Sequence, residues 1–442
     1  MRKITLAILV VFLLIGNCFA QQEKGIIGYD NWLDTWTEFQ PSKITYEEPT
    51  QILSGRIAID TKLTKRNTYL LVGDVFITNN ATLSIEPGTV ILGDFKTKGS
   101  LIISKGSKII AEGKQTDPII FTSNRSVKKP GDWGGIFVLG DAPLNSYGNE
   151  SSINYGLRPT SFMDIVYGGE NSESDSGVLK YVRIEFAGKR TKEHGNLSGL
   201  TLAGVGSDTT LYNVMVSYCQ GNSFNLLGGN LVLVKMVSFR SNQNDYNFNY
   251  GAQCNLVNSL AVRSPYVSSA DGSRALFITS YDYKEDADPT KEYTNVNAEN
   301  LTLLNVSNDL ESDIEIGLVQ EAIYVGNDVS FVSDRSVISG FSPAVILDDQ
   351  IKMNDSNLRK IEFIRTYFNN CNGNLFRKGY TNNDDLESWY GSRAFNNVYS
   401  KGPDSETFID AIHKKYPDYR LRINGIIASN DYFDDDDDDD ED

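Results

Sequence analysis

The feature that most constrains the fold of this chain is a succession of very short β-prone segments separated by turn residues. Between residues 73 and 139, each segment holds three or four mainly apolar residues, and Gly, Pro, Asn or Asp lies between segments. The segments are Val75–Ile77, Leu83–Ile85, Val90–Leu92, Leu101–Ile103, Ile109–Ala111, Ile119–Phe121 and Ile136–Leu139. Because Gly or Pro breaks the β-branched runs every few residues, a helix cannot form here. Strands this short that recur about every 20 residues are typical of a solenoid in which each repeat is one coil.

Internal alignments support this interpretation. Residues 81–88 align with residues 99–106 at a shift of 18, and Tyr218, Phe239 and Val262 are equivalent at shifts of 21 and 23. Alternation within residues 181–186 predicts that Val182, Ile184 and Phe186 share one face of a strand. We therefore expect an all-β fold, a right-handed parallel β-helix over residues 55–370. The residues expected to point inward are Ile85, Ile103, Ile110, Phe121, Val216, Val237 and Leu260.

A solenoid needs covers for its open ends. We expect residues 21–54 to form an N-terminal cap, in which the aromatic stretch 29–41, with Trp32, Trp36 and Phe39, plugs the first coil. Residues 371–433 are the expected C-terminal cap region. Within it, residues 403–416 predict one amphipathic helix with an apolar face over the last coil. That face comprises Phe408, Ile409, Ile412 and Tyr416. The polar stretch 283–292 predicts a loop that projects from a turn.

The first 20 residues have the pattern of a secretory signal peptide. Arg2 and Lys3 precede an apolar run over residues 4–15, and Ala20 provides a small residue for cleavage. Cys18 offers an alternative, because it would be the lipid-modified residue of a lipoprotein. No later stretch approaches the roughly 20 apolar residues of a membrane-spanning helix. We therefore expect an exported protein of the periplasm, the outer-membrane surface or the extracellular space, with no transmembrane segment in the mature chain.

Three cysteines remain after the signal peptide, which is too few for a disulfide scaffold. Cys219 and Cys254 fall in neighbouring repeats, where they either face each other or are separate buried thiols. The formal net charge is −17, and residues 434–442 carry nine of the acidic groups. Such a chain is not expected to bind nucleic acid or anionic membranes. The acidic run predicts a disordered tail.

The middle repeats contain candidate ligand-binding residues. Phe224 and Asn225 match Phe248 and Asn249 at a shift of 24, which predicts an aromatic stack and an amide ladder between coils. Such a ladder either presents polar groups to a ligand or only joins adjacent coils. Candidate ligand contacts are Asn225, Asp245, Asn247, Asn249 and Trp133, where Trp133 is alternatively a buried plug of its Gly-rich turn.

Several segments resemble a family of exported right-handed β-helix proteins of Gram-negative bacteria, often described as lipoproteins. The matching segments are residues 85–91, 111–113, 118–123, 131–136, 181–185, 199–202 and 228–229, and Gly-Asp-Trp-Gly-Gly at 131–135 is the most specific. Family members often accompany outer-membrane TonB-dependent receptors, so the resemblance implies an envelope role and such a receptor as a partner. The segments here at 221–225 and 242–249 are usually acidic in the family. In this chain amides replace most acids and only Asp245 remains, so a calcium site there should be weak or lost.

The parallel β-helix also occurs in pectin and alginate lyases and in polygalacturonases, although fold alone does not establish function. Hydrolysis requires two suitably spaced carboxylates. The acidic pairs Asp348-Asp349 and Asp384-Asp385 lack the companion motifs of polygalacturonases, and both His194 and His413 are expected in solvent. We therefore assign no catalytic residue and no cofactor. The favoured function is a non-catalytic envelope or surface protein, either a glycan-binding module or an accessory to a receptor. The alternatives are a polysaccharide lyase or hydrolase and a purely structural surface protein.

The acidic tail generates a first prediction. Deletion of residues 434–442 should change the free energy of unfolding by less than about 0.5 kcal/mol, because nine adjacent charges cannot pack into a core. Weak calcium binding, no tighter than about 10⁻⁴ to 10⁻³ M, is expected at Asp434, Asp435, Asp436 and Asp437, and calorimetry should show that the deletion reduces it. A clearly lower melting temperature of the truncated protein would mean that the tail belongs to the fold.

Overall fold

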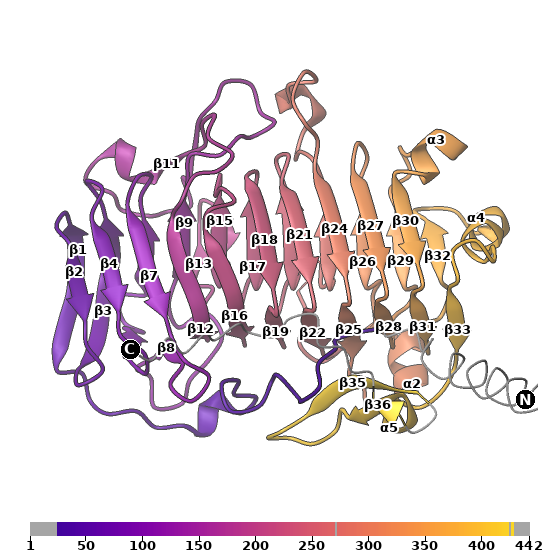
Figure 1. Cartoon of the computed structure of the whole chain (residues 1–442), viewed down its shortest axis with the longest axis horizontal. Helices are drawn as coiled ribbons and strands as arrows, with labels where there is room; N and C mark the ends of the chain where they lie inside the picture. The colour runs from indigo at the N-terminus through magenta and orange to yellow at the C-terminus, as the bar shows by residue number, and fades with distance from the viewer. Residues whose placement is uncertain (1–23, 270–271, 424–425, 428–442) are drawn as a thin grey trace, which may run out of the picture.

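The computed structural model describes residues 24–269, 272–423 and 426–427, and it confirms the right-handed parallel β-helix (Figure 1). One parallel sheet system of 29 strands winds through the described chain from β1 (Gln51–Ile57) to β33 (Val398–Ser400). The predicted signal peptide, with Cys18, and the acidic tail lie outside the described residues. No helix in the described residues is long and apolar enough to cross a membrane.

The strands stack on three faces, here called faces A, B and C, which the chain visits in that order in each coil. Face A consists of β2 (Thr61–Leu63), β4 (Thr82–Ile85), β7 (Lys108–Glu112), the first halves of β12 (Gly177–Glu185) and β16 (Thr210–Ser217), β18 (Asn230–Val234), β21 (Gln253–Val257), β24 (Asn295–Glu299), β27 (Ser330–Asp334) and β30 (Ile361–Ile364).

Face B begins with the first halves of β1 and β3 (Thr68–Ile77). It continues with β5 (Val90–Gly93), β8 (Ile119–Ser123), the second halves of β12 and β16, β19 (Val237–Phe239), β22 (Leu260–Arg263), β25 (Thr302–Asn305), β28 (Val337–Ser339), β31 (Tyr367–Asn369) and β33.

Face C begins with the second halves of β1 and β3. It continues with β6 (Ser100–Ile103), β9 (Gly135–Leu139), β15 (Leu200–Ala203), β17 (Phe224–Leu227), β20 (Tyr246–Asn249), β23 (Leu276–Ile278), β26 (Ile323–Val325), β29 (Val345–Leu347) and β32 (Leu375–Arg377).

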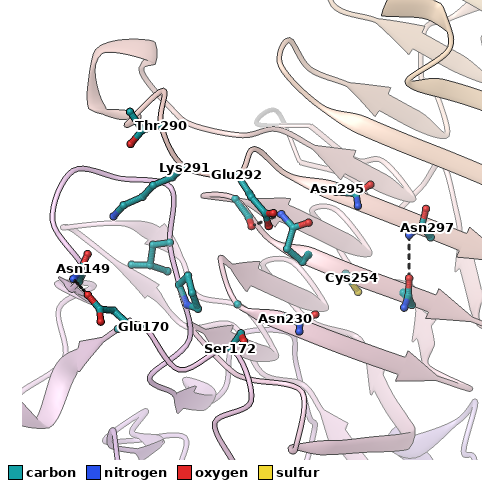
Figure 2. A pocket seen from close by; sticks show the side chains of 17 residues that line it. Asn149, Glu170, Ser172, Asn230, Cys254, Thr290, Lys291, Glu292, Asn295 and Asn297 are labelled. Atoms are coloured by element: carbon teal, nitrogen blue, oxygen red, sulfur yellow. Dashed lines mark hydrogen bonds between the residues drawn. The ribbon is translucent and has the colours of Figure 1, made fainter.

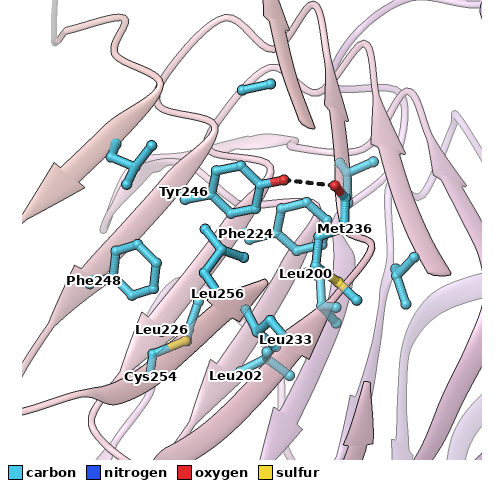
Figure 3. Close-up of a cluster of buried hydrophobic side chains, with 14 of the residues drawn as sticks. Leu200, Leu202, Phe224, Leu226, Leu233, Met236, Tyr246, Phe248, Cys254 and Leu256 are labelled. Carbon is cyan, nitrogen blue, oxygen red and sulfur yellow. Dashed lines mark hydrogen bonds between the residues drawn. The ribbon is translucent and has the colours of Figure 1, made fainter. Parts of the chain in front are cut away.

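The interior of the coil is a continuous apolar core built from the inward-facing residues of all three faces. Figure 3 shows part of it, where Leu200, Phe224 and Tyr246 occupy equivalent positions of three successive coils. The rings of Phe224 and Tyr246 stack with centroids 5.1 Å apart, and the Tyr246 hydroxyl donates to the Met236 carbonyl at 3.0 Å. Parallel coils place equivalent side chains directly above one another, so the core is a set of columns.

The alternation of inward and outward residues is confirmed for Val182 and Ile184, and Ile85, Ile103, Phe121 and Val216 lie in the core as predicted. Ile110 is a correction: Ile109 and Ala111 point inward, and Ile110 is half-buried on the outer side. Val237 and Leu260 are buried, but they belong to a second cluster outside the coil. The reason is a register shift of one residue: Val237 pairs with Met215, which also points outward, and not with the inward Val216.

Two of the predicted registers differ from the observed ones. Phe239 pairs with Ser217 rather than with Tyr218, which has a positive φ of 52° and lies in the following corner. The segments at 81–88 and 99–106 lie on different faces, because Leu83 pairs with Ile109 on face A and Leu101 pairs with Val75 on face C. Similar sequences therefore form strands on different faces of the same solenoid.

The aromatic N-terminal segment does not plug the first coil, which corrects the prediction. It runs along the outside of face B, where Trp36 and Phe39 pack on a strip of outward side chains that includes Met215 and Val237. Its backbone is held by face B corners: the Gly25 amide donates to the Arg335 carbonyl at 2.7 Å, and the Tyr218 hydroxyl donates to the Phe39 carbonyl at 3.1 Å. A buried aromatic side chain removes roughly 150–250 Å² from water, or about 4–6 kcal/mol of favourable transfer free energy.

The C-terminal cap also differs from the prediction. Residues 403–416 do not form one helix: α5 (Asp404–Thr407) is followed by β34 (Phe408–Asp410), which pairs antiparallel with β35 (Asp418–Ile423), itself paired with β36 (Ile426–Ile427). Phe408 and Tyr419 complete the cover of face B beside Phe39, whereas Ile412 and Tyr416 are exposed. The last coil is instead capped by α4 (Asp384–Tyr390), whose Leu386 and Tyr390 join the interior core.

The remaining short elements lie in loops that project from the turns. They are the hairpin of β10 (Ser151–Ser152) with β11 (Val166–Tyr167), η2 (Phe162–Ile165), the hairpin of β13 (Arg190–Thr191) with β14 (Gly195–Asn196), η3 (Lys284–Asp286), α2 (Leu310–Glu315) and α3 (Asp355–Leu358). By contrast, η1 (Pro41–Lys43) lies in the N-terminal segment that precedes β1. The stretch 283–292 is a loop, as predicted, and it contains η3 and a bridge residue, Ala287.

The core generates a second prediction. Ile103→Asp should lower the free energy of unfolding by more than about 4 kcal/mol, because it buries an unpaired charge at a fully buried position. Urea denaturation followed by circular dichroism measures this loss. Ile59→Asp is the matched control, since the Ile59 side chain is 75% exposed, and it should change stability by less than about 0.5 kcal/mol. Equal stability of the two variants would contradict the assigned core.

Candidate functional site

The candidate site is a cavity of about 690 Å³ on the outer side of face A, at strands β18, β21 and β24 (Figure 2). Two long connections from face C to face A form its walls: residues 140–176, between β9 and β12, and residues 279–294, between β23 and β24. The cavity is thus made of three consecutive coils and two loops that begin far apart in the sequence.

The floor of the cavity consists of amide side chains from equivalent positions of neighbouring coils. Asn230, Gln253 and Asn295 pair in register across the three strands, and Asn255 pairs with Asn297 in the parallel row. The Asn297 Nδ2 donates to Asn255 Oδ1 at 3.1 Å. Within the described residues, the half-buried side chains of Asn230 and Asn295 make no hydrogen bond to protein. Several amide donors and acceptors therefore face the cavity with unused hydrogen-bonding capacity.

The first wall is fixed to the turns between faces C and A. The Gly229 amide donates to the Pro143 carbonyl at 2.9 Å, and the Asn145 amide donates to the Tyr250 carbonyl at 3.1 Å. The buried Asn145 side chain donates to the Ser280 carbonyl at 2.7 Å, and the neighbouring Leu144 is buried in an apolar cluster on face C. These contacts hold residues 143–145 against the coil, so the wall is part of the folded body.

The second wall is anchored at its base by Asp282. Asn249 Nδ2 donates to Asp282 Oδ1 at 2.7 Å, and the Tyr250 hydroxyl donates to Asp282 Oδ2 at 2.6 Å. The turn beneath is tight: Gly251 has a φ of 81°, and a Cβ there would lie 2.8 Å from the Glu292 carbonyl oxygen. Only glycine allows the loop to approach the coil this closely.

The two walls also bind each other. The Asp288 amide donates to the Asn145 carbonyl at 2.7 Å, and Lys291 Nζ donates to the Ser146 carbonyl at 2.9 Å. A short β-bridge joins Ser146 to Ala287. The cavity is consequently preformed, since neither wall can move without breaking contacts with the other.

The charged groups at the cavity are few and lie at its rim. Glu170 and Glu292 are exposed, and Asn149 Nδ2 donates to Glu170 Oε1 at 2.7 Å. Lys291 is the lining cation and is already bound to backbone carbonyls. The site is therefore suited to bind a polar, hydroxyl-rich ligand through amide hydrogen bonds rather than to hold a strongly charged one.

Trp133 does not contact solvent, which corrects its assignment as a ligand contact. Its indole is 1% exposed, stacks against Phe121 with centroids 6.4 Å apart, and donates from Nε1 to the Glu185 carbonyl at 2.8 Å. Trp133 is therefore a buried plug of its Gly-rich turn, which was the alternative to a ligand contact. The glycines around it allow this, because a Cβ at Gly93 would lie 2.5 Å from the Trp133 side chain.

The predicted amide ladder exists on face C, but in a register shifted by two residues. Asn225 pairs with Asn247 rather than with Asn249, and Asn247 Nδ2 donates to Asn225 Oδ1 at 2.7 Å. Likewise Phe224 stacks on Tyr246 and not on Phe248. Asn225 and Asn249 are buried, and both form intramolecular bonds. These amides join adjacent coils, and Asn249 in addition holds Asp282 at the base of the second wall.

Asp245 is not a ligand group on the surface. It is fully buried, pairs with Arg263 NH1 at 2.8 Å and accepts a hydrogen bond from Ser238. Arg263 also donates to the carbonyls of Gln243 and Arg274 at 2.9 and 3.1 Å. This ion pair locks the corner between faces B and C, and removal of either partner would leave a buried charge without compensation.

The other residues considered from the sequence lie apart from the cavity. His194 is exposed, as expected, in the turn between β13 and β14; its ring stacks on Tyr155 with centroids 3.5 Å apart, and partial burial lowers its pKa. His413 lies in an exposed turn between β34 and β35. Cys219, Cys254 and Cys371 are separate buried thiols, and burial raises the pKa of Cys219 to about 12. Asp348 accepts a hydrogen bond from Tyr324 on face C.

Among residues 24–269, 272–423 and 426–427, no group of three or more His, Cys, Asp or Glu side chains could hold a metal ion. The predicted weak calcium site at Asp434–Asp437 lies outside the described residues.

Sequence reasoning missed the floor residues Asn230, Gln253, Asn255, Asn295 and Asn297. A signal was present, because the three segments that contain them follow the Gly-rich turns at 228–229 and 251 or the polar loop 283–292. Alignment of these segments in register would have placed the amides in two adjacent rows. The walls could not be foreseen, since contact between residues 145–146 and 287–288 depends on the paths of two long loops.

Comparison with known families agrees with this architecture. The chain matches the family model described as the pectate-lyase-like β-helix domain over residues 55–407, and it belongs to that family. No curated protein and no solved structure matches the chain.

The anchored wall generates a third prediction. Asp282→Ala should increase amide hydrogen exchange of residues 283–292 about thirtyfold, because loss of its two hydrogen bonds costs about 2 kcal/mol of local stability. Hydrogen-exchange mass spectrometry gives the measurement. Asp208→Ala, at an exposed turn of another coil, is the control and should leave exchange in this loop unchanged. Identical exchange in both variants would show that Asp282 does not anchor the wall.

Proposed function

We propose that this member of the pectate-lyase-like β-helix family is an exported, non-catalytic glycan-binding protein of the cell envelope, and that the amide-floored cavity on face A is its binding site. Family membership favours a role connected with polysaccharides. The observation that carries the proposal is the pair of in-register amide rows beneath two interlocked loops.

The chemistry of the floor fits a sugar. Each hydroxyl of a sugar ring donates and accepts hydrogen bonds, and each amide side chain offers both functions as well. Asn230 and Asn295 have both functions available, and the pair of Asn255 and Asn297 presents its remaining donors and acceptors at the cavity edge. The cavity volume of about 690 Å³ lies within the range of roughly 300–1,000 Å³ found for small-molecule sites.

Binding without cleavage is favoured by the setting of the carboxylates. Glu170 and Glu292 are exposed at the rim, and Glu170 is engaged by Asn149. A glycosidase acid usually lies in a shielded, apolar environment that keeps its proton. Lys291, the basic side chain at the cavity, is bound to the carbonyls of Ser146 and Gly148. Lys291 consequently supports the walls of the site.

A hydrolase is the second candidate, because two carboxylates do line the same cavity. A hydrolytic mechanism would use Glu170 and Glu292 as its acid and base pair. A structural surface protein is the third candidate, and it predicts no saturable ligand at all.

The cellular setting is proposed from the sequence. The basic, apolar and small-residue regions of residues 1–20 support export, and the segments shared with envelope β-helix proteins support an association with an outer-membrane TonB-dependent receptor. In this arrangement the protein would hold a glycan near the receptor.

The proposal predicts that the purified protein binds a glycan on an array and that the floor amides determine its affinity. Asn295→Ala and Asn297→Ala should each weaken binding about fivefold, because each change removes about 1 kcal/mol of hydrogen bonding. Isothermal titration calorimetry with the best array ligand provides the measurement. Gln51→Ala, an exposed amide on the first coil, is the matched control and should not alter the affinity.

The same samples separate the three candidates. Release of reducing ends or of unsaturated uronates, abolished by Glu170→Gln and Glu292→Gln, would establish the hydrolase or lyase alternative. An array without any ligand would favour the structural role. Equal affinities of the floor variants and the control would place the binding site elsewhere on the protein.

A further inference from the structure

A second cavity, of about 530 Å³, lies along the same edge of the solenoid, two coils further towards the C-terminus. It is formed by the turn 326–329 between β26 and β27, by the connection 348–360 that contains α3, and by the far side of the loop 279–294. The loop therefore separates two cavities: residues 290–292 line the first, and Lys284 and Tyr293 line the second.

The second cavity has an excess of positive charge in a strongly acidic protein. Three lysines line it, Lys284, Lys352 and Lys360, against one carboxylate, Asp328. The chain as a whole has a formal net charge of −17. A concentration of cations within this background produces a local positive potential that attracts anions.

The single carboxylate is already satisfied by the protein. Asp328 Oδ2 accepts hydrogen bonds from the Tyr281 hydroxyl at 2.7 Å, from Lys284 Nζ at 2.9 Å and from Asn327 Nδ2 at 3.1 Å. Lys284 and Asp328 neutralise each other as an ion pair. The charge that remains for a ligand comes from Lys352 and Lys360 on the opposite wall.

The other polar side chains that line the second cavity offer mainly hydrogen-bond donors. In the part of the chain that the structure describes, neither ammonium group of Lys352 and Lys360 has a carboxylate partner, and the hydroxyl of Tyr293 makes no hydrogen bond. The Gln350 side chain adds an amide that makes no intramolecular hydrogen bond within the same ranges. Two ammonium groups, a hydroxyl and an amide around one cavity match the acceptor oxygens of an oxyanion.

We infer that this second cavity is a binding site for an oxyanion, of the kind presented by a sulfate, a phosphate or a sugar carboxylate, with Lys352 and Lys360 as its principal ligands. Lys284 has a different role, because it neutralises Asp328 and so prevents that carboxylate from repelling the anion. The site does not rest on the proposed glycan function, since its donors belong to other turns than the amide floor of the first cavity.

The test uses the mature protein and three probes: inorganic sulfate, inorganic phosphate and glucuronate. Each is titrated at low ionic strength, and chemical-shift changes of the lysine side chains and the Tyr293 ring are followed by nuclear magnetic resonance. Saturable binding of at least one probe is expected, and its affinity should fall as sodium chloride is added, because exposed charges are screened. The probe that binds most tightly identifies the source of the anion.

Variants locate the site. Lys352→Gln and Lys360→Gln should each weaken binding about tenfold, and the double variant should abolish it, because a charge-assisted hydrogen bond is replaced by a neutral one. Lys96→Gln, an exposed lysine near the first coils, removes the same charge elsewhere and should retain full affinity. Melting temperatures of all variants check that they remain folded. Absence of saturable binding for all three probes, or equal weakening by Lys96→Gln, would overturn the inference.

Discussion

The hydrogen bonds between equivalent strands of successive coils are the interaction on which the whole structure depends. They fix the rise from coil to coil, and thereby place each side chain directly above its counterpart. Inside the coil this produces columns such as Phe224 on Tyr246. Outside it produces rows such as Asn230, Gln253 and Asn295. The same geometry therefore builds an apolar core from apolar repeats and a polar binding surface from amide repeats.

The coil itself could be predicted because its signals are local. Short apolar segments and regular turns define a solenoid, and alternation within residues 182–185 assigns the inner and outer sides. The registers are less secure, since a shift by two residues preserves the face: sequence similarity matches Asn225 with Asn249, although Asn225 pairs with Asn247. A shift by one residue changes the side altogether, as at Val237, which pairs with the outward Met215 and lies under the apolar cover over face B.

The walls of the candidate site could not be predicted from the sequence, for a different reason. Its floor follows the repeat, but its walls are two loops joined by contacts between residues separated by more than a hundred positions, such as Lys291 with Ser146. Their path depends on packing that no local pattern encodes. The buried ion pair of Asp245 and Arg263 illustrates the same limit, because an acidic residue in a polar stretch gave no sign that it would lie in the interior. Tertiary contacts, and not local composition, determine the position of the cavity walls and of this ion pair.

The segment that covers face B has a consequence for the order of folding. Gly25, near the start of the described chain, is bound to the carbonyl of Arg335, and the strip beneath it is completed by Phe408 and Tyr419. The N-terminal segment would thus have no docking surface until most of the coils had formed. The cost of closing so long a loop favours assembly of the coils first and attachment of the N-terminal segment last. The N-terminal segment would therefore stay undocked until Arg335, Phe408 and Tyr419 had reached their places in the fold.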